Sequence, residues 1–393
     1  MSDEFDQIIV RKGTGSTKWD NLTMRVSNPD ALPMWVADSD FACAGPIVEA
    51  MVRRAAHPIY GYAYVPPEFA GVTADWLKKR HHWTVSPDWV LYSPGVVPAL
   101  SLAVQTFTKP GDEVIIQRPV YHPFSNVVRE NGRCVSANRL IYREGRYEVD
   151  FEDLERRAKS PKAKLMLLCN PHNPTGRVFT RTELARIAEI CIANQVLIVS
   201  DEIHADIVYG SCVHTVLAGM NPLWSDYVIT CHAPSKTFNI AGLEASAVII
   251  SNDALRAAMK SALEATHINV PNAFAMAGYL AAYSQCEDYL ERQLIYLQNN
   301  VRFVDERLRE TMPKIRLVQP EATYLLWLDC TKLGLDAEGV TEFFVEEAAI
   351  AINPGDLFGP EGSGFVRMNI ACPRSVLEQA MKQLEMAYDK RDY

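Results

Sequence analysis

Short apolar runs alternate with helical patterns between about residue 90 and residue 251. Five runs are almost entirely apolar, and we expect a strand at each: 114–116, 164–169, 196–200, 228–231 and 246–251. Apolar residues at helical spacing lie between them, at 124–131 and 181–194. Strands that are apolar on both faces are typical of a sheet covered by helices on both sides. The alternation therefore predicts a mostly parallel sheet built from strand–helix–strand units.

The chain before this region has a different pattern. Residues 1–45 have the character of an irregular arm, with a turn signal at Asn28-Pro29-Asp30. Helical patterns follow at 46–56 and 68–83. We expect the arm to lie against a smaller domain and both helices to belong to the large one.

Beyond residue 253 long helical patterns dominate, and 287–308 is rich in leucine, glutamate and arginine. This stretch indicates one long helix between two domains. After it, strands are expected at 323–328 and 365–370, and helices at 337–348 and 375–388. The chain therefore divides into an arm that joins the small domain (1–45), a large domain (46–285), and a connecting helix with a small α+β domain (286–393).

Composition narrows the class of protein. The 39 basic and 48 acidic side chains give a net charge of −9, without a basic cluster, which argues against nucleic acid or an anionic membrane as a partner. The nine cysteines are an odd number with no CxxC pair, and the acidic amino terminus lacks the profile of a signal peptide. No apolar run is long enough to span a bilayer. We expect a cytoplasmic protein with free thiols and a small-molecule partner.

Three of the predicted strands end in polar clusters of unusual composition. The clusters are Asn170-Pro-His-Asn-Pro-Thr-Gly176, Ser200-Asp-Glu-Ile-His204 and Ala233-Pro-Ser-Lys-Thr-Phe-Asn239. Because the carboxyl ends of parallel strands meet at one edge of a sheet, we expect these clusters to lie together. Each has an ordinary alternative: a turn for the first, a helix cap at Asp201 or a core histidine at His204 for the second, and a solvated lysine for the third.

Their combination indicates a more specific chemistry. A carboxylate at the end of an apolar strand needs a cation, and the pyridinium nitrogen of a cofactor is such a cation for Asp201. The amide of Asn173 suits a phenolate oxygen, and the amine of Lys236 can form an imine with an aldehyde. Together these are what pyridoxal 5′-phosphate (PLP) requires from a protein.

These motifs resemble those of the fold-type I PLP enzymes, in the class I/II aminotransferase-like superfamily. Asp201-Glu-Ile-His-Ala-Asp206 and Ser235-Lys-Thr-Phe-Asn-Ile-Ala-Gly-Leu243 are most similar to the branch of cystathionine β-lyases and C–S lyases. The resemblance extends from Trp35-Val-Ala-Asp-Ser-Asp-Phe41 to Cys372-Pro-Arg374. It implies an α/β fold of type I, with a mostly parallel seven-stranded sheet flanked by helices and a smaller α+β domain.

The resemblance also implies a role for each site residue. Lys236 is the imine-forming lysine and general base, Asp201 the partner of the ring nitrogen, and Asn173 a partner of the ring oxygen. His204 lies near that oxygen, and Tyr121 stacks on the ring. The expected substrate contacts are Arg367, Asn173 and Ala37, with Arg367 holding the α-carboxylate.

The phosphate of PLP is expected to bind at the start of a helix, on the backbone N–H groups of Gly95, Val96 and Val97. Ser235 can add a hydroxyl. The family implies a homodimer in which Tyr62 reaches the phosphate from the neighbouring subunit, and Tyr62 or Tyr121 assists catalysis. Many related aminotransferases carry an arginine eight residues after the lysine, and this chain has Glu244 there.

We therefore expect a PLP-dependent carbon–sulfur β-lyase that converts L-cystathionine or a related cysteine S-conjugate to pyruvate, ammonia and a thiol. The departure at Glu244 favours this reaction. Two alternatives remain open from the residues. An aminotransferase acting on an L-amino acid and a 2-oxo acid would use the same lysine, aspartate and arginine. A non-catalytic regulatory partner could also retain PLP.

Overall fold

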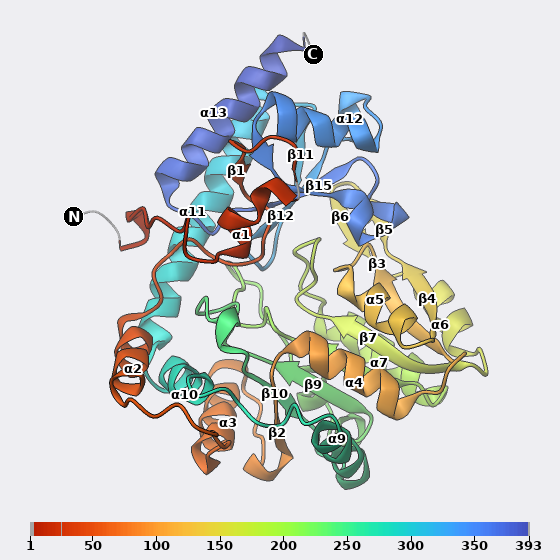
Figure 1. Ribbon diagram of the computed structural model, residues 1–393. Helices are drawn as coiled ribbons and strands as arrows, with labels where there is room; N and C mark the ends of the chain where they lie inside the picture. The colour runs from red at the N-terminus through yellow and green to blue at the C-terminus, as the bar shows by residue number, and fades with distance from the viewer. Residues whose placement is uncertain (1–3, 25, 392–393) are drawn as a thin grey trace.

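The computed structural model describes residues 4–24 and 26–391, so the first three residues of the acidic amino terminus lie outside the description. Its largest sheet has seven strands in the order β2, β10, β9, β8, β7, β3, β4 (Figure 1). Their bounds are Val90–Ser93 (β2), Ser246–Ile249 (β10), Val228–His232 (β9), Leu197–Asp201 (β8), Ala163–Cys169 (β7), Glu113–Arg118 (β3) and Cys134–Arg139 (β4). β10 is antiparallel to both of its neighbours, and the other pairings are parallel. The predicted seven-stranded, mostly parallel sheet is confirmed.

The apolar strands are explained by burial on both faces of this sheet. Along β7, Leu165 and Leu167 pack into one hydrophobic cluster, whereas Met166 and Leu168 pack into another. The side chains of a strand alternate between faces, so both sets lose contact with water. Nine helices of the large sheet region have the bounds Gly45–Ala56 (α2), Pro67–His81 (α3), Val96–Phe107 (α4), Pro123–Glu130 (α5), Phe151–Ala158 (α6), Arg181–Ala193 (α7), Pro222–Ser225 (α8), Asp253–Ala265 (α9) and Ala275–Gln285 (α10).

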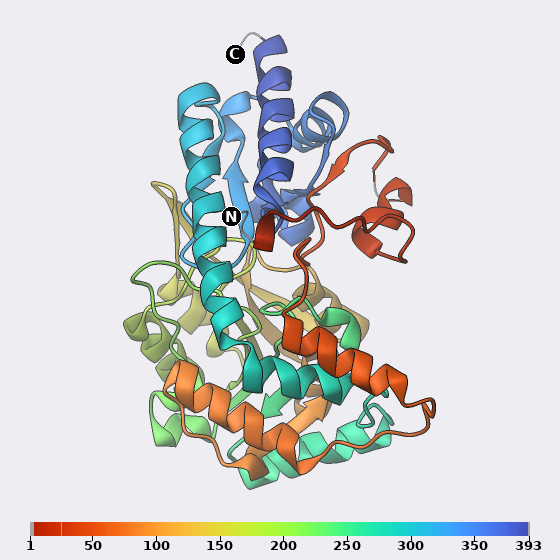
Figure 2. The same cartoon turned by 90° about the vertical axis from the view of Figure 1, so that its left-hand side faces the viewer.

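A second, smaller layer lies at the other end of the long helix α11, Glu287–Thr311 (Figure 2). Its four-stranded antiparallel sheet has the order β11, β12, β15, β14, with bounds Arg316–Val318, Leu325–Asp329, Phe365–Asn369 and Asn353–Pro354. Helices α12, Ala337–Glu342, and α13, Arg374–Lys390, complete it. The helix that the sequence predicts through residue 348 is α-helical only to Glu342, and Phe343–Glu347 continue as a π-helix.

The amino-terminal arm contacts this smaller layer. Strand β1, Leu32–Pro33, pairs in parallel with β13, Ile350–Ala351, and the short helix α1 spans Thr17–Asp20. A two-stranded hairpin, β5 (Ile141–Arg143) with β6 (Arg146–Glu148), extends from the large sheet region. On these contacts we propose the division of the chain at residues 45 and 285. None of the described helices has the length and apolar character that a membrane span requires.

Candidate active site

A cavity of about 180 Å³ lies at the carboxyl ends of β7, β8 and β9. The polar residues that follow these apolar strands lie at this edge, because each strand stays buried up to its last residue. The structure brings ten of the predicted site residues to the cavity wall: Ala37, Gly95, Val96, Val97, Tyr121, Asn173, Asp201, His204, Ser235 and Lys236. Tyr62 and Arg367 are not among the residues that line it.

Lys236 follows β9 by four residues, and its amine points toward the arm. Its Nζ donates a hydrogen bond to the carbonyl oxygen of Ala37, at 2.8 Å. Burial lowers the pKa of Lys236 to about 8, and the positive charge of Arg367 adds to this effect, while Asp38 and Asp201 oppose it. An amine with this pKa has a free lone pair in a useful fraction of molecules near neutral pH, which suits both imine formation and proton abstraction.

Asp201 is the last residue of β8 and lies beside Cys169 of β7 and Cys231 of β9. Its Oδ1 accepts a hydrogen bond from the backbone N–H of Ile203, at 3.1 Å. Burial raises the pKa of Asp201 to about 7. A carboxylate this deeply buried gains from a positively charged partner, and the protonated nitrogen of a pyridine ring in the cavity would be one.

His204 offers a second observation that fits a bound group. Its imidazole is 2% exposed, and Nδ1 has no hydrogen-bond partner among the described residues. Burial, together with the charges of Lys236 and Arg367, lowers the pKa of His204 to about 3, so the ring is neutral. A neutral, unpartnered imidazole nitrogen facing this region can exchange a hydrogen bond with a ring substituent.

Arg367, on β15, reaches the site from the small domain and lies against Asn173. Its Nη1 donates to Oδ1 of Asn173 and its Nη2 to the carbonyl of Trp35, both at 3.0 Å. The guanidinium is buried, lies 5.0 Å from the centre of the Phe358 ring, and leaves Nε without a partner. Arg367 is therefore held by protein groups that a carboxylate could replace.

The start of α4 forms the far wall. The first intrahelical bond runs from the N–H of Ala99 to the oxygen of Gly95, at 3.2 Å. The N–H groups of Val96 and Val97 precede it, and Pro98 has none to offer. Free N–H groups at a helix amino terminus bind phosphate well, and Ser235 lines the same cavity.

Tyr121 is a half-buried residue of the cavity wall, and its backbone N–H donates to the carbonyl of Asn173, at 3.0 Å. Burial raises the pKa of its hydroxyl. Tyr62 is fully exposed, in the stretch between α2 and α3, and has no part in this cavity within its own chain. Glu244 is an exposed residue of positive φ beyond the cavity wall.

Sequence reasoning missed two residues beside Lys236. The hydroxyl of Tyr324 donates to the same carbonyl of Ala37 that Lys236 uses, at 3.1 Å. Asp38 is paired with Arg11, at 2.6 Å, and its charge acts on Lys236. The Trp35–Phe41 stretch contains Asp38 and could have pointed to it, but Arg11 and Tyr324 carry no local signal.

Comparison with known proteins places this geometry in a family. The model of the family "Aminotransferase class I and II" matches residues 46–384. Cystathionine beta-lyase PatB of Bacillus subtilis (strain 168) is 40% identical over 98% of this chain and 99% of its own, and Protein MalY of Escherichia coli (strain K12) is 34% identical over 97% of each.

Among solved structures, cystalysin from Treponema denticola, which contains a pyridoxal 5′-phosphate cofactor, is 34% identical and covers 100% of both chains with a TM-score of 0.95. The resemblance that the sequence motifs indicate is confirmed. The chain therefore belongs to the class I and II aminotransferase family, and within it resembles PatB and MalY over nearly its whole length.

Proposed function

We propose that the protein is a PLP-dependent carbon–sulfur β-lyase that acts on L-cystathionine or related cysteine S-conjugates. The observation that carries the proposal is the cavity in which Lys236 and Asp201 lie together. The similarity to PatB over nearly the whole chain supports elimination as the reaction. In that reaction cystathionine and water give homocysteine, pyruvate and ammonia, so the carbon–sulfur bond is broken and the thiol leaves with a proton.

PLP, when bound, withdraws electrons from the Cα atom of the substrate so that its proton becomes removable. The residues of the chain that would hold it are Lys236, Asp201, Asn173 and His204, with the start of α4 and Ser235 at the phosphate. Asp201 keeps a proton at the ring nitrogen, because a buried carboxylate is stabilised by the positive charge that results. This contribution is electrostatic and needs no movement of the protein.

Lys236 removes the Cα proton in this scheme. Its lowered pKa keeps part of the amine unprotonated near neutral pH, and its hydrogen bond to Ala37 shows the direction from which it can approach a substrate. Tyr121 is close enough to the cavity to orient the substrate or to supply a proton to the departing sulfur. Arg367 and Asn173 bind the α-carboxylate, and the carbonyl of Ala37 faces the same space.

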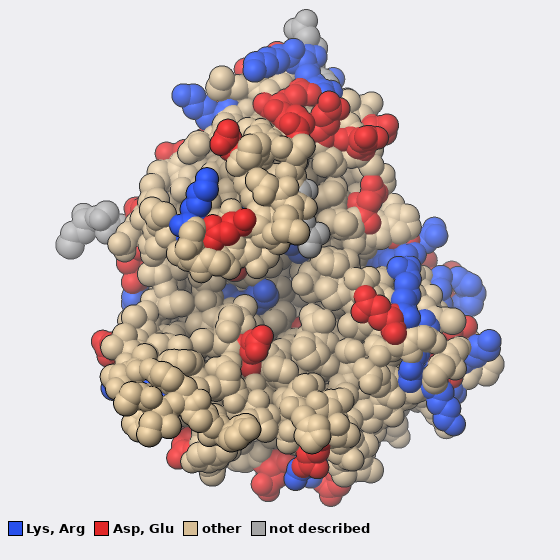
Figure 3. All heavy atoms as spheres, viewed as in Figure 1, with Lys and Arg blue, Asp and Glu red and all other residues tan. Residues whose placement is uncertain are grey.

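We also propose a homodimer, on the exposure of the stretch after α2. Large apolar side chains lie exposed there and on nearby segments: Val48, Val52, Ile59, Tyr60, Tyr62, Tyr64 and Val270. Charged side chains are few over the lower left of the face in Figure 3, where α2 lies in Figure 1. A partner covering this surface would remove apolar area from water and could place Tyr62 of the partner subunit at the phosphate site.

A reducing, cytoplasmic location is part of the same proposal. All nine cysteines belong to the described residues, and all are free thiols. Six of them are buried and two more half-buried, which leaves Cys134 as the exposed thiol. Free thiols in this number are typical of proteins from reducing compartments.

An aminotransferase is the second candidate, because the matching family model carries that name and the residues around Lys236 serve both reactions. The test is product analysis with purified holoenzyme. With cystathionine as sole substrate we expect pyruvate and thiol in equal amounts, without any 2-oxo acid added. The variant Lys236→Ala should form neither. Strict dependence of turnover on an added 2-oxo acid would overturn the lyase assignment in favour of the aminotransferase.

A further inference from the structure

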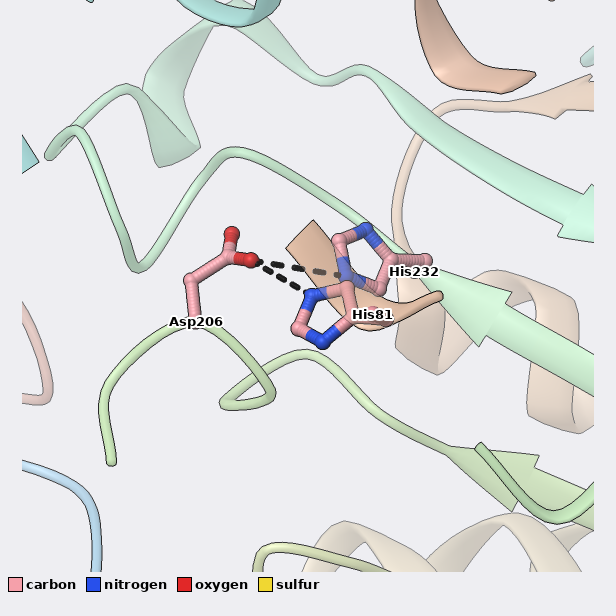
Figure 4. Close-up of side chains that lie close together, drawn as sticks. All are labelled: His81, Asp206 and His232. Atoms are coloured by element: carbon pink, nitrogen blue, oxygen red, sulfur yellow. Dashed lines mark hydrogen bonds and ion pairs between the residues drawn. The ribbon is translucent and has the colours of Figure 1, made fainter. Parts of the chain in front are cut away.

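Three potential metal ligands converge on one point outside the cavity of Lys236 (Figure 4). His81 is the last residue of α3, Asp206 follows β8, and His232 is the last residue of β9. Nε2 of His81 lies 2.8 Å from Oδ1 of Asp206, and Nε2 of His232 lies 4.0 Å from the same oxygen. All three donor atoms lie within 4.8 Å of one another.

His232 is the residue that this arrangement leaves unsatisfied. Its side chain is 1% exposed, and its Nε2 has no hydrogen-bond partner although it points at Asp206. Asp206 itself is well supplied: Trp76 donates to Oδ1 at 3.0 Å, and Thr237 donates to Oδ2 at 2.8 Å. A buried polar atom without a partner raises the free energy of the folded state, so a further group between His232 and Asp206 would stabilise the protein.

Contacts behind His232 hold its ring in place. Nδ1 of His232 lies 2.7 Å from the hydroxyl of Tyr283. The ring of Tyr283 packs edge-on against that of Tyr279, with 5.0 Å between the ring centres, and the hydroxyl of Tyr279 lies 2.8 Å from that of Thr73. These contacts leave Nε2 of His232 directed at Asp206.

When the proton of His232 is on Nδ1, the lone pair of Nε2 faces a carboxylate oxygen, and a cation between the two atoms completes this arrangement. We propose that His81, Asp206 and His232 form a binding site for one divalent transition-metal ion of the zinc class. Two imidazole nitrogens and a carboxylate oxygen are a preferred donor set for such ions. In tetrahedral coordination, bonds of about 2.0–2.2 Å place donor atoms about 3.3–3.6 Å apart. The pair His81–Asp206 would open slightly, and His232 would move inward by on the order of 1 Å or less.

The surrounding groups already have the form of an outer shell for a metal. The contact between Nδ1 of His232 and the hydroxyl of Tyr283 holds the ring with its Nε2 inward, as the outer hydrogen bonds of metal-bound histidines do. At Asp206, binding would replace the proton that His81 now donates, and the lone pair of Oδ1 so freed would take the metal. A neutral His81 then carries its proton on Nδ1 instead of Nε2, so the ion binds without net release of a proton.

The site also has an entrance and an open position. His81 and Asp206 line a surface pocket of about 380 Å³, whereas His232 lies behind them. A water molecule from this pocket can occupy the remaining coordination position. The neighbouring His214 lines the pocket as well, but its Nε2 is held by Glu202 at 2.8 Å and is not available as a ligand.

The bound ion would join three segments that are distant in sequence, namely the end of α3, the loop after β8 and the end of β9. Thr237 connects Asp206 to the loop of Lys236, but Lys236 itself does not touch the cluster. We therefore expect a structural role, with an effect on stability and no direct part in the reaction. The inference does not depend on the proposed function.

The test uses the purified holoenzyme, freed of metals with a chelator and then equilibrated with Zn²⁺ or Co²⁺. We expect one ion per chain after dialysis, a rise in melting temperature with Zn²⁺ that saturates at that stoichiometry, and a Co²⁺ absorption spectrum of nitrogen and oxygen ligation without thiolate bands. A wild-type protein that retains no metal, or whose Co²⁺ spectrum shows thiolate ligation, would overturn the proposal without any variant.

Two neighbouring histidines provide a matched pair of variants. His81→Asn removes a ligand, whereas His82→Asn changes the exposed residue next to it, where a positive φ suits asparagine. We expect His81→Asn to weaken Zn²⁺ binding at least tenfold and His82→Asn to leave it unchanged. His232→Gln should weaken it as His81→Asn does, and far-UV circular dichroism with cofactor absorbance would verify that each variant is folded. Equal affinity in all of them would refute the site.

Discussion

Two buried aspartates five residues apart have opposite acidities. Asp201 is 5% exposed and Asp206 is 3% exposed, so burial raises the pKa of both carboxyl groups. Asp201 receives one backbone hydrogen bond, and its pKa stays raised, at about 7. Hydrogen bonds from His81 and Thr237 outweigh burial at Asp206 and hold its pKa well below its usual range.

From this difference we infer a separate role for each carboxylate. Asp206 gains its stabilisation inside the protein, so it can fasten α3 to the loops after β8 and β9 in any state of the enzyme. The hydrogen bond from Ile203 and the charge of Lys236 offset only part of the cost of burying Asp201, and a positively charged ligand would offset more of it. A buried acid with too few donors, next to an amine of lowered pKa, marks a functional site more clearly than a well-paired one does.

The largest effect should come from breaking the better-paired carboxylate. Asp206→Asn removes the charge that three donors share, and we expect it to lower the free energy of unfolding by about 3–5 kcal/mol. Urea unfolding of the holoenzyme measures this loss. The exposed Asp226→Asn is the control and should be neutral. A loss at Asp206 no greater than at Asp226 would contradict the contrast.

Asp201→Asn should produce the reverse result. We expect kcat to fall on the order of 10²–10³-fold, because the positive charge on the cofactor ring loses its partner. The stability of the cofactor-free protein should not fall, since a poorly paired buried carboxylate is removed. Steady-state kinetics with cystathionine and unfolding without PLP give the two numbers. Normal kcat together with lowered stability would reverse the roles of the two aspartates.

The pH dependence of the free energy of unfolding tests the same contrast between Asp201 and Asp206, and it needs no activity measurement. In the cofactor-free protein the pKa of Asp201 lies near 7, above its unfolded value near 4. The folded state therefore binds more protons between these values, and the contribution of Asp201 to stability is full below pH 4 and is lost as pH rises through 7. Between pH 5 and pH 7 the loss amounts to about 2 kcal/mol.

This slope must be taken as a difference between wild type and Asp201→Asn. The pKa values of His172 and His204 are lowered by burial, to about 4 and about 3, and give a slope of opposite sign in the acid range. Both histidines are present in wild type and in Asp201→Asn, so their contributions to the slope cancel in the difference. Lys236 contributes to the pH dependence of the free energy of unfolding only between about pH 8 and 10.5, where its contribution makes stability rise with pH. A wild-type minus variant difference that is flat from pH 5 to 7 would show that Asp201 is an ordinary acid.

The active-site side of this contrast could be predicted from the sequence, because the apolar pattern of a strand predicts where the polar residues after it lie. Apolar runs fix β7, β8 and β9, and the carboxyl ends of parallel strands share an edge, so Asn173, Asp201 and Lys236 had to meet. The same rule says nothing of strands with a weaker pattern. β4, Cys134–Arg139, is rich in polar residues and β2, Val90–Ser93, is short, and neither was predicted as a strand.

The partners of Asp206 were beyond prediction for a physical reason. His81 lies 125 residues before Asp206, at the end of an amphipathic helix, where a histidine is an unremarkable last-turn residue. Only the packing of α3 against the sheet brings the two side chains together. The reversed direction of β10 has a similar origin, since the apolar pattern of a buried strand is the same in both directions.

The smallest expected effect tests the hydrogen bond that joins Asp206 to the loop of Lys236. The hydroxyl of Thr237 donates to Asp206 and is the neighbour of Lys236 in the chain. Thr237→Val keeps the shape of the side chain but removes this donor, so we expect a loss of about 1–2 kcal/mol in the free energy of unfolding. Because Lys236 donates its own hydrogen bond to the carbonyl of Ala37, kcat should fall less than about fivefold. Thr237→Ser, which keeps the donor, should recover most of the stability. A fall in kcat as large as that of Asp201→Asn would mean that the Asp206 cluster positions the lysine and that the two regions are not independent.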